Sequence, residues 1–96
     1  MLVSEPQDEF LNYALAIELE HEGQLTEATT ILQALLKRNP AYLAGYYKLG
    51  ELLSKAALKE EAVIAYQQGM ALAKQQKNPK TFQELRQALE NLEEED

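Results

Sequence analysis

The chain has 96 residues, of which 46% are hydrophobic and 26% are charged, proportions typical of a single soluble domain. It contains no Cys, which excludes a disulfide framework, a thiolate metal site and a cysteine nucleophile. The protein has a formal net charge of −7, so a phosphate backbone would repel it and we expect no nucleic acid partner.

The N-terminal stretch, MLVSEPQDEF, in which the first predicted helix opens, has neither a basic region nor a long apolar run. We therefore expect no signal peptide, no membrane span and a cytoplasmic protein. Ser4 can cap this helix, Pro6 is tolerated in its first turn, and Gln7 can return the hydrogen bond. The apolar residues that follow cover too wide an arc for one buried stripe, which predicts a helix sandwiched between neighbours. They are Phe10, Leu11, Ala14, Leu15, Ala16, Ile17 and Leu19.

Three more helices are predicted before residue 77. Gly23 can take the left-handed conformation that ends the first helix, and Thr26 can serve as the N-cap of the second. The second helix ends at Asn39-Pro40, because a proline disfavours helical backbone in the residue before it. The third helix is expected at about 41–54 and the fourth at about 59–76.

The fifth predicted helix follows Asn78-Pro79, which repeats the Asn39-Pro40 pair 39 residues further on. This spacing predicts a fourth helix about five residues longer than the second, and a fifth helix at about 81–92. Aligning the two prolines sets the apolar residues of the fifth helix opposite those of the third. They are Leu85, Ala88, Leu89 and Leu92, opposite Tyr46, Leu49, Gly50 and Leu53.

One residue pattern occurs twice in the chain, 34 residues apart. The second copy reads Tyr46-x2-Leu49-Gly50-x2-Leu53 and then Ala62-x3-Tyr66, with Gly50 and Ala62 as the small residues where two helices can approach. The first copy keeps Leu15, Leu19, Ala28-x3-Leu32 and Pro40, with Asn12 and Ala16 in the large and glycine slots. In these residues and in its period, the chain resembles the tetratricopeptide repeat family.

The resemblance implies an all-α fold, a right-handed stack of antiparallel helix hairpins (an α-solenoid). The single domain, 1–96, would hold repeat 1 at about 9–42 and repeat 2 at about 43–77. A capping helix would follow at about 79–92, and then an acidic tail at 93–96.

The resemblance also implies a peptide-binding groove, lined by set positions of the first helix of each repeat. Carried over to this chain, these positions are Phe10, Tyr13, Ile17 and Glu20, then Ala44, Tyr47, Glu51 and Ser54, and on the fifth helix Gln83, Arg86 and Glu90, with Lys48 at the border. The alternative is that the aromatic residues pack the first helix against the third. The carboxylate clamp of the chaperone-binding members is absent, because Tyr13, Ile17 and Lys48 stand at positions where it needs Lys, Asn and Asn.

No motif predicts catalysis, a metal or a cofactor. Glu18-x-x-His21 matches the ligand pair of di-metal helix bundles, but such a site needs that motif twice and the chain has one His. The glutamate pairs fit helix ends and solvated faces better than general acid–base work.

The resemblance, together with the lack of a catalytic motif, implies a non-enzymatic adaptor that binds a protein or peptide segment on the concave face of a short array. Tyr13 and Tyr47 would supply contact surface, while Lys48 and Arg86 would favour an acidic group in the ligand. We expect a monomer or weak homodimer, because the fifth helix would cover the apolar edge of the second repeat. The alternative is a structural self-association module that completes its core by homo-oligomerising, since two repeats are few for independent stability.

Overall fold

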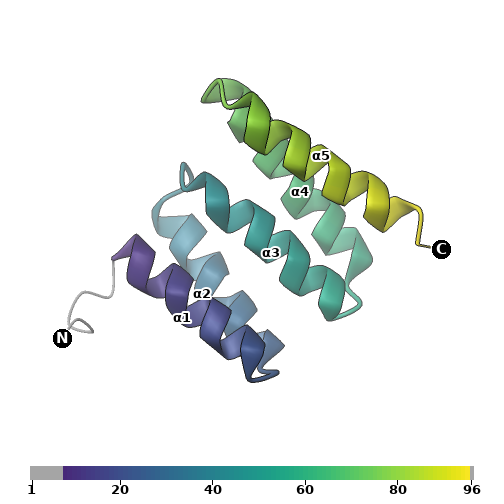
Figure 1. The fold of residues 1–96 in the computed structure, drawn as a ribbon. Coiled ribbons are helices and arrows are strands. Elements are labelled where there is room, and N and C mark those ends of the chain that lie inside the picture. Colours follow the sequence, from purple (N-terminus) through teal and green to yellow (C-terminus); the bar gives the residue numbers. More distant parts are fainter. Residues whose placement is uncertain (1–7, 96) are drawn as a thin grey trace.

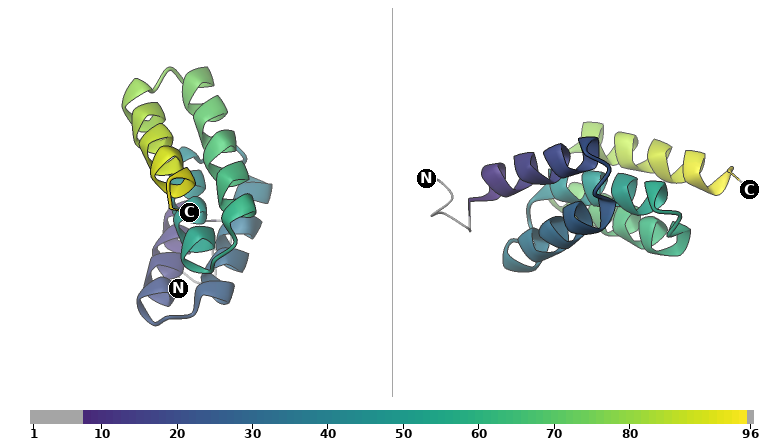
Figure 2. Two further views of the ribbon diagram at one scale, coloured as in Figure 1. Left: turned by 90° about the vertical axis from the view of Figure 1, so that its right-hand side faces the viewer. Right: turned by 90° about the horizontal axis from the view of Figure 1, so that it is seen from below.

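A computed structural model of the protein describes residues 8–95, which form five helices and no strand. They are α1 (Glu9–His21), α2 (Leu25–Arg38), α3 (Leu43–Lys55), α4 (Lys59–Gln75) and α5 (Pro79–Glu93). Successive helices run antiparallel, with α1, α3 and α5 in one layer and α2 and α4 in the other (Figures 1 and 2). The predicted all-α stack of helix hairpins is confirmed.

Three of the four connections are the same three-residue turn. Its middle residue has a positive φ: 79° at Gly23, 64° at Ala57 and 56° at Lys77. In each turn the next backbone N–H donates to a carbonyl five residues back, as Gln24 N does to Leu19 O at 2.8 Å. This is the Schellman pattern, which satisfies the last carbonyl groups of a helix. Gly23 therefore ends α1 as predicted.

The helix starts differ from prediction at two places. The expected cap by Ser4 and Gln7 lies outside the described residues; α1 begins at Glu9, where the Asp8 side chain accepts a hydrogen bond from Leu11 N at 3.0 Å. The prediction of Thr26 as an N-cap is wrong, because α2 already begins at Leu25. Inside the helix, the Thr26 carbonyl accepts from the Thr30 hydroxyl at 3.0 Å instead.

The fifth helix begins earlier than the proline alignment predicted. Pro79 is the first residue of α5, and the Asn78 side chain caps the helix by accepting from Thr81 N at 3.1 Å. Pro40, in contrast, lies in a loop three residues before α3, where its carbonyl accepts from the Tyr46 hydroxyl at 2.9 Å. The two prolines are not equivalent, and α4 has 17 residues against 14 in α2, three more rather than five.

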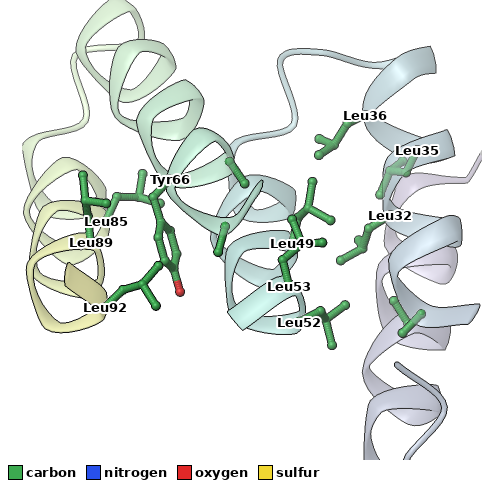
Figure 3. Close-up of a cluster of buried hydrophobic side chains, with 14 of the residues drawn as sticks. Leu32, Leu35, Leu36, Leu49, Leu52, Leu53, Tyr66, Leu85, Leu89 and Leu92 are labelled. Atoms are coloured by element: carbon green, nitrogen blue, oxygen red, sulfur yellow. The ribbon is translucent and has the colours of Figure 1, made fainter. Parts of the chain in front are cut away.

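The core is a continuous set of leucine, alanine and tyrosine side chains between the two layers. Figure 3 shows Leu32, Leu35 and Leu36 of α2 facing Leu49, Leu52 and Leu53 of α3, and Tyr66 of α4 beside Leu85, Leu89 and Leu92 of α5. Each fully buried leucine contributes roughly 1.5–3 kcal/mol relative to an exposed one.

The contact between α3 and α4 depends on Gly50. A Cβ atom at this position would lie 2.6 Å from Cδ1 of the Tyr66 ring, which is closer than carbon atoms pack. Ala62 is also fully buried. The small residues predicted at this crossing are present, and the Gly50 site is filled by the Tyr66 ring.

The outer face of α1 differs from the prediction of a sandwiched helix. Ala16 is the only buried residue of α1, whereas Leu11 and Leu15 are 39% and 45% exposed. Their equivalents in α3, Gly45 and Leu49, are buried, Gly45 against Leu36 of α2. No helix among the described residues precedes α1, so no described helix covers this face as α2 covers that of α3. None of the helices in residues 8–95 is both long and apolar enough to cross a bilayer.

Candidate functional site

Two adjoining hollows, each of about 360 Å³, lie between α3 and α5 and share Tyr47 and Glu84. Together they are the α3–α5 groove. The Glu95 hollow is lined by Tyr47, Glu51, Ser54, Tyr66, Glu84, Gln87, Ala88, Asn91, Leu92 and Glu95. The Tyr13 hollow is lined by Tyr13, Leu43, Ala44, Tyr47, Gln76, Asn78, Thr81 and Glu84.

The tyrosine rings of the groove are held in place by other tyrosines. Tyr47 meets Tyr66 edge to face, with ring centroids 6.1 Å apart and an interplanar angle of 66°. Tyr13 meets Tyr42 in the same way at 5.8 Å and 64°. An edge-to-face pair of this kind stabilises the fold by roughly 0.5–1.5 kcal/mol in addition to the contribution from burying the two side chains. A ligand would thus meet ring surfaces that are already ordered.

Carboxylates lie near the rings of Tyr47 and Tyr66. Burial raises the pKa of Tyr47, and the negative charges of Glu51 and Glu84 raise it further. Burial likewise raises the pKa of Tyr66 to about 12, with added contributions from the charges of Glu51 and Glu95. Both phenols therefore stay protonated at neutral pH and experience a negative potential.

An ion-pair network lies beside the groove and joins α1 to α3. The Glu20 carboxylate, whose side chain is 5% exposed, accepts from Lys48 Nζ at 2.9 Å and also from Lys55 Nζ. Lys48 Nζ makes a second pair with Glu51 at 2.9 Å. Burial alone would raise the pKa of Glu20, but hydrogen bonds from Lys55 and Lys48 outweigh it and lower the pKa below its ordinary value.

The predicted site residues separate into two groups. Tyr13, Tyr47 and Glu51 line the groove, as do Ala44 and Ser54. The others line neither hollow: Phe10, Ile17, Lys48 and Arg86, with Glu20, Gln83 and Glu90.

The predicted site residues Phe10, Tyr13 and Ile17 of α1 lie in different surroundings. Phe10 is 70% exposed, so it does not pack α1 against α3. Tyr13 and Ile17 are half-buried, Tyr13 against Tyr42 at the start of α3. The alternative of simple packing between the two helices therefore fails for Phe10.

The two predicted cations are already paired. Lys48 is shared by Glu20 and Glu51, and Arg86 Nε lies 3.2 Å from the Glu90 carboxylate one turn away on α5. They do not present free positive charge to the groove.

The proline alignment places Arg86 in the groove, but the register of that alignment is wrong. Thr81, Glu84, Ala88 and Asn91 line the groove, each 37 positions after its counterpart Ala44, Tyr47, Glu51 or Ser54. The Asn-Pro dipeptide alone does not give this register, because Asn39-Pro40 lies in a loop before α3 whereas Asn78-Pro79 starts α5.

Nothing in the described part of the chain has the geometry of a metal centre. Within residues 8–95, no three His, Asp or Glu side chains come together to hold an ion. Every buried side-chain polar atom there has a hydrogen-bond partner, so none is held unpaired as catalytic groups often are.

Stacked antiparallel hairpins with a groove along one layer define an α-solenoid, a helical-repeat scaffold. No protein-family model matches the sequence, and no curated protein is similar enough to count as a relative. Among solved structures, the solution NMR structure of a tetratricopeptide repeat domain protein from Salinibacter ruber is similar at a TM-score of 0.89. It is 30% identical over 95% of this chain and 92% of that chain. A crystal structure of a tetratricopeptide repeat domain protein from the same organism gives a TM-score of 0.85, at 29% identity over 93% and 99%.

The chain belongs to the tetratricopeptide repeat family. The family membership that the residue pattern indicated is confirmed. Domains of this family are protein-interaction modules in general, and typically scaffolds rather than enzymes.

Proposed function

We propose that this protein is a non-enzymatic adaptor that binds a segment of another protein in the α3–α5 groove. The observation that carries the proposal is the position of Tyr47. It lines both hollows, and its ring is held against Tyr66. Ordered aromatic surface in a hollow is the typical anchor of a peptide-binding site, because little side-chain entropy is lost on binding.

The groove suits a segment better than a small molecule. Both hollows are open, and they adjoin along α3 and α5 rather than enclosing one cavity. An extended or helical segment could place side chains in both hollows at once. We expect an affinity near micromolar, which corresponds to about −8 kcal/mol.

A blocking substitution tests the proposal without removing a core contact. Ala44 is an exposed residue of α3 that lines the Tyr13 hollow, so Ala44→Trp would fill the groove. Ala34 is exposed on α2, in the other layer and outside both hollows, so Ala34→Trp is the matched control. Peptides selected from a random library with the full chain would then be titrated by calorimetry. We expect Ala44→Trp to weaken binding at least about tenfold, or about 1.4 kcal/mol, and Ala34→Trp to leave it unchanged. Equal effects of the two variants would place binding outside the groove.

A second candidate function, self-association, is favoured by the outer face of α1. Leu11 and Leu15 lie four residues apart, on one face of the helix, and both are exposed. A second copy could cover them as α2 covers the equivalent face of α3. The molecular mass on dilution separates the candidates: a monomer throughout favours the adaptor.

The cytoplasmic location, expected from the sequence, stays a prediction.

A further inference from the structure

The described residues in the walls of the α3–α5 groove include carboxylates and no basic side chain. Three glutamates line the Glu95 hollow. Glu51 lies on α3, Glu84 lies on α5, and Glu95 lies just beyond the end of α5. Glu84 also lines the Tyr13 hollow, where the remaining residues are uncharged. Among the residues that line either hollow, none is Lys, Arg or His.

The three carboxylates are not equally available to a ligand. Glu51 is paired with Lys48, which Glu20 also holds, and this partly compensates its charge. Glu84 and Glu95 form no ion pair with any described residue. Among the described residues, the groove therefore keeps two carboxylates without an ion-pair partner, on the α5 side.

These carboxylates stand next to aromatic surface. Tyr47, which is half-buried, shares both hollows with Glu84, whereas Tyr66 is only 4% exposed and leaves little ring surface in the hollow that it shares with Glu95. A guanidinium or ammonium group placed there could contact a carboxylate and the face of a tyrosine ring together. An acidic group in the same place would meet like charge and no basic partner.

We propose that the α3–α5 groove selects a basic segment, one that carries Arg or Lys next to an apolar side chain. This inference rests on the proposed function and names the chemistry of its ligand. The apolar side chain fits the Tyr13 hollow, between Tyr13, Leu43 and Ala44. The basic side chain fits the Glu95 hollow, opposite Glu84. This preference for a basic segment reverses the expectation of an acidic ligand, which depended on Lys48 and Arg86 being free.

The charge of the whole chain acts in the same direction. At a net charge of −7, the protein attracts cationic segments from a distance and repels acidic ones. Salt screens this attraction, so affinity for a basic segment should fall as ionic strength rises.

The test uses the full chain and three short synthetic peptides with one Phe in the same frame. The Phe is flanked by arginines in the first peptide, by serines in the second and by glutamates in the third. We expect the arginine peptide to bind tightest, about tenfold tighter than the serine peptide at low salt, which is about 1.4 kcal/mol. The glutamate peptide should bind weakest.

Two charge variants locate the effect. Glu84→Gln should weaken binding of the arginine peptide by about three- to tenfold and weaken binding of the serine peptide less. Glu60→Gln removes the same charge from the exposed start of α4, outside both hollows, and should have little effect.

Each outcome distinguishes this inference from the proposed function. Equal or tighter binding of the glutamate peptide, still blocked by Ala44→Trp, would overturn the basic preference and leave the adaptor standing. Arginine-peptide binding that Glu84→Gln and Glu60→Gln weaken equally would also overturn it, because only net charge would then matter. If Ala44→Trp weakened the binding of none of the peptides, both the basic preference and the proposed function would be overturned.

Discussion

The two helix hairpins of this protein share one plan and differ in what covers them. The α3–α4 hairpin lies between α2 and α5, and Leu49 on its first helix is 7% exposed. Among the described residues, the α1–α2 hairpin has a neighbouring helix on one side only, and the equivalent Leu15 is 45% exposed. The same residue type at the same repeat position is therefore core in one hairpin and surface in the other.

The difference shows that position in the stack, rather than helix composition, decides burial in a repeat protein. Each hairpin buries one face internally and offers another to its neighbour, so the terminal hairpins leave a face uncovered unless a cap is present. At the C-terminal end, α5 supplies that cover through Leu85, Leu89 and Leu92. At the N-terminal end, no helix among the described residues does so.

The largest effect should come from comparing leucines at the two ends. Leu85 of α5 is fully buried, so Leu85→Ala should lower the free energy of unfolding by roughly 2–5 kcal/mol. Leu15→Ala makes the same chemical change on the open face of α1 and should cost less than about 1 kcal/mol. Urea unfolding monitored by circular dichroism measures both. If Leu15→Ala proves as costly as Leu85→Ala, the outer face of α1 is covered in solution and self-association becomes the better reading.

The comparison also shows which features a sequence can predict. The repeat period and the positive φ at Gly23 were predictable, because both follow from local residue patterns. The register of α5 was mispredicted because Asn39-Pro40 and Asn78-Pro79 look alike as dipeptides. In the structure Asn78 caps a helix, whereas the Asn39 side chain bonds to Glu9 and to Ala41 N ahead of a loop.

The charge state of the groove could not be predicted from spacing. Lys48 and Glu20 are 28 residues apart in the chain, and Lys55 and Glu20 are 35 apart. Their pairing depends on how α1 docks beside α3. For the same reason the sequence predicted an acidic ligand: Lys48 was identified as a cation near the groove, but its partners were not.

A smaller effect should come from Glu20, which ties the open hairpin to the covered one. Glu20→Gln removes the charge that Lys48 and Lys55 share, and should cost roughly 1–3 kcal/mol at pH 7. Because the pKa of Glu20 is lowered by folding, its contribution is present above pH 4.5 and is lost as pH falls through the lowered value. The stability difference between wild type and Glu20→Gln should therefore shrink below about pH 4.5.

The control for this experiment is Glu90→Gln on α5. Glu90 pairs with Arg86 on the helix surface, where both side chains are about half exposed, so the cost should be about 0.5 kcal/mol or less. Chemical denaturation at a series of pH values measures both variants. A Glu20→Gln difference that stays constant down to pH 3 would show that the network does not link the hairpins through charge.

The smallest effect should come from exchanging the turn residues of the two hairpins. The α1–α2 turn has Gly23 at φ 79°, and the α3–α4 turn has Ala57 at φ 64° in the same place. A side chain in this conformation costs roughly 1 kcal/mol, because Cβ crowds the carbonyl oxygen. A Cβ at Gly23 would meet no atom within 4 Å, so Gly23→Ala measures the backbone cost alone. We expect Gly23→Ala to destabilise by about 1 kcal/mol and Ala57→Gly to stabilise by a similar or smaller amount. In a domain of this size these changes shift the melting temperature by about 4–8 °C, in opposite directions. Shifts of the same sign in calorimetry would mean that the two turns, despite their shared geometry, are not equivalent parts of one repeated plan.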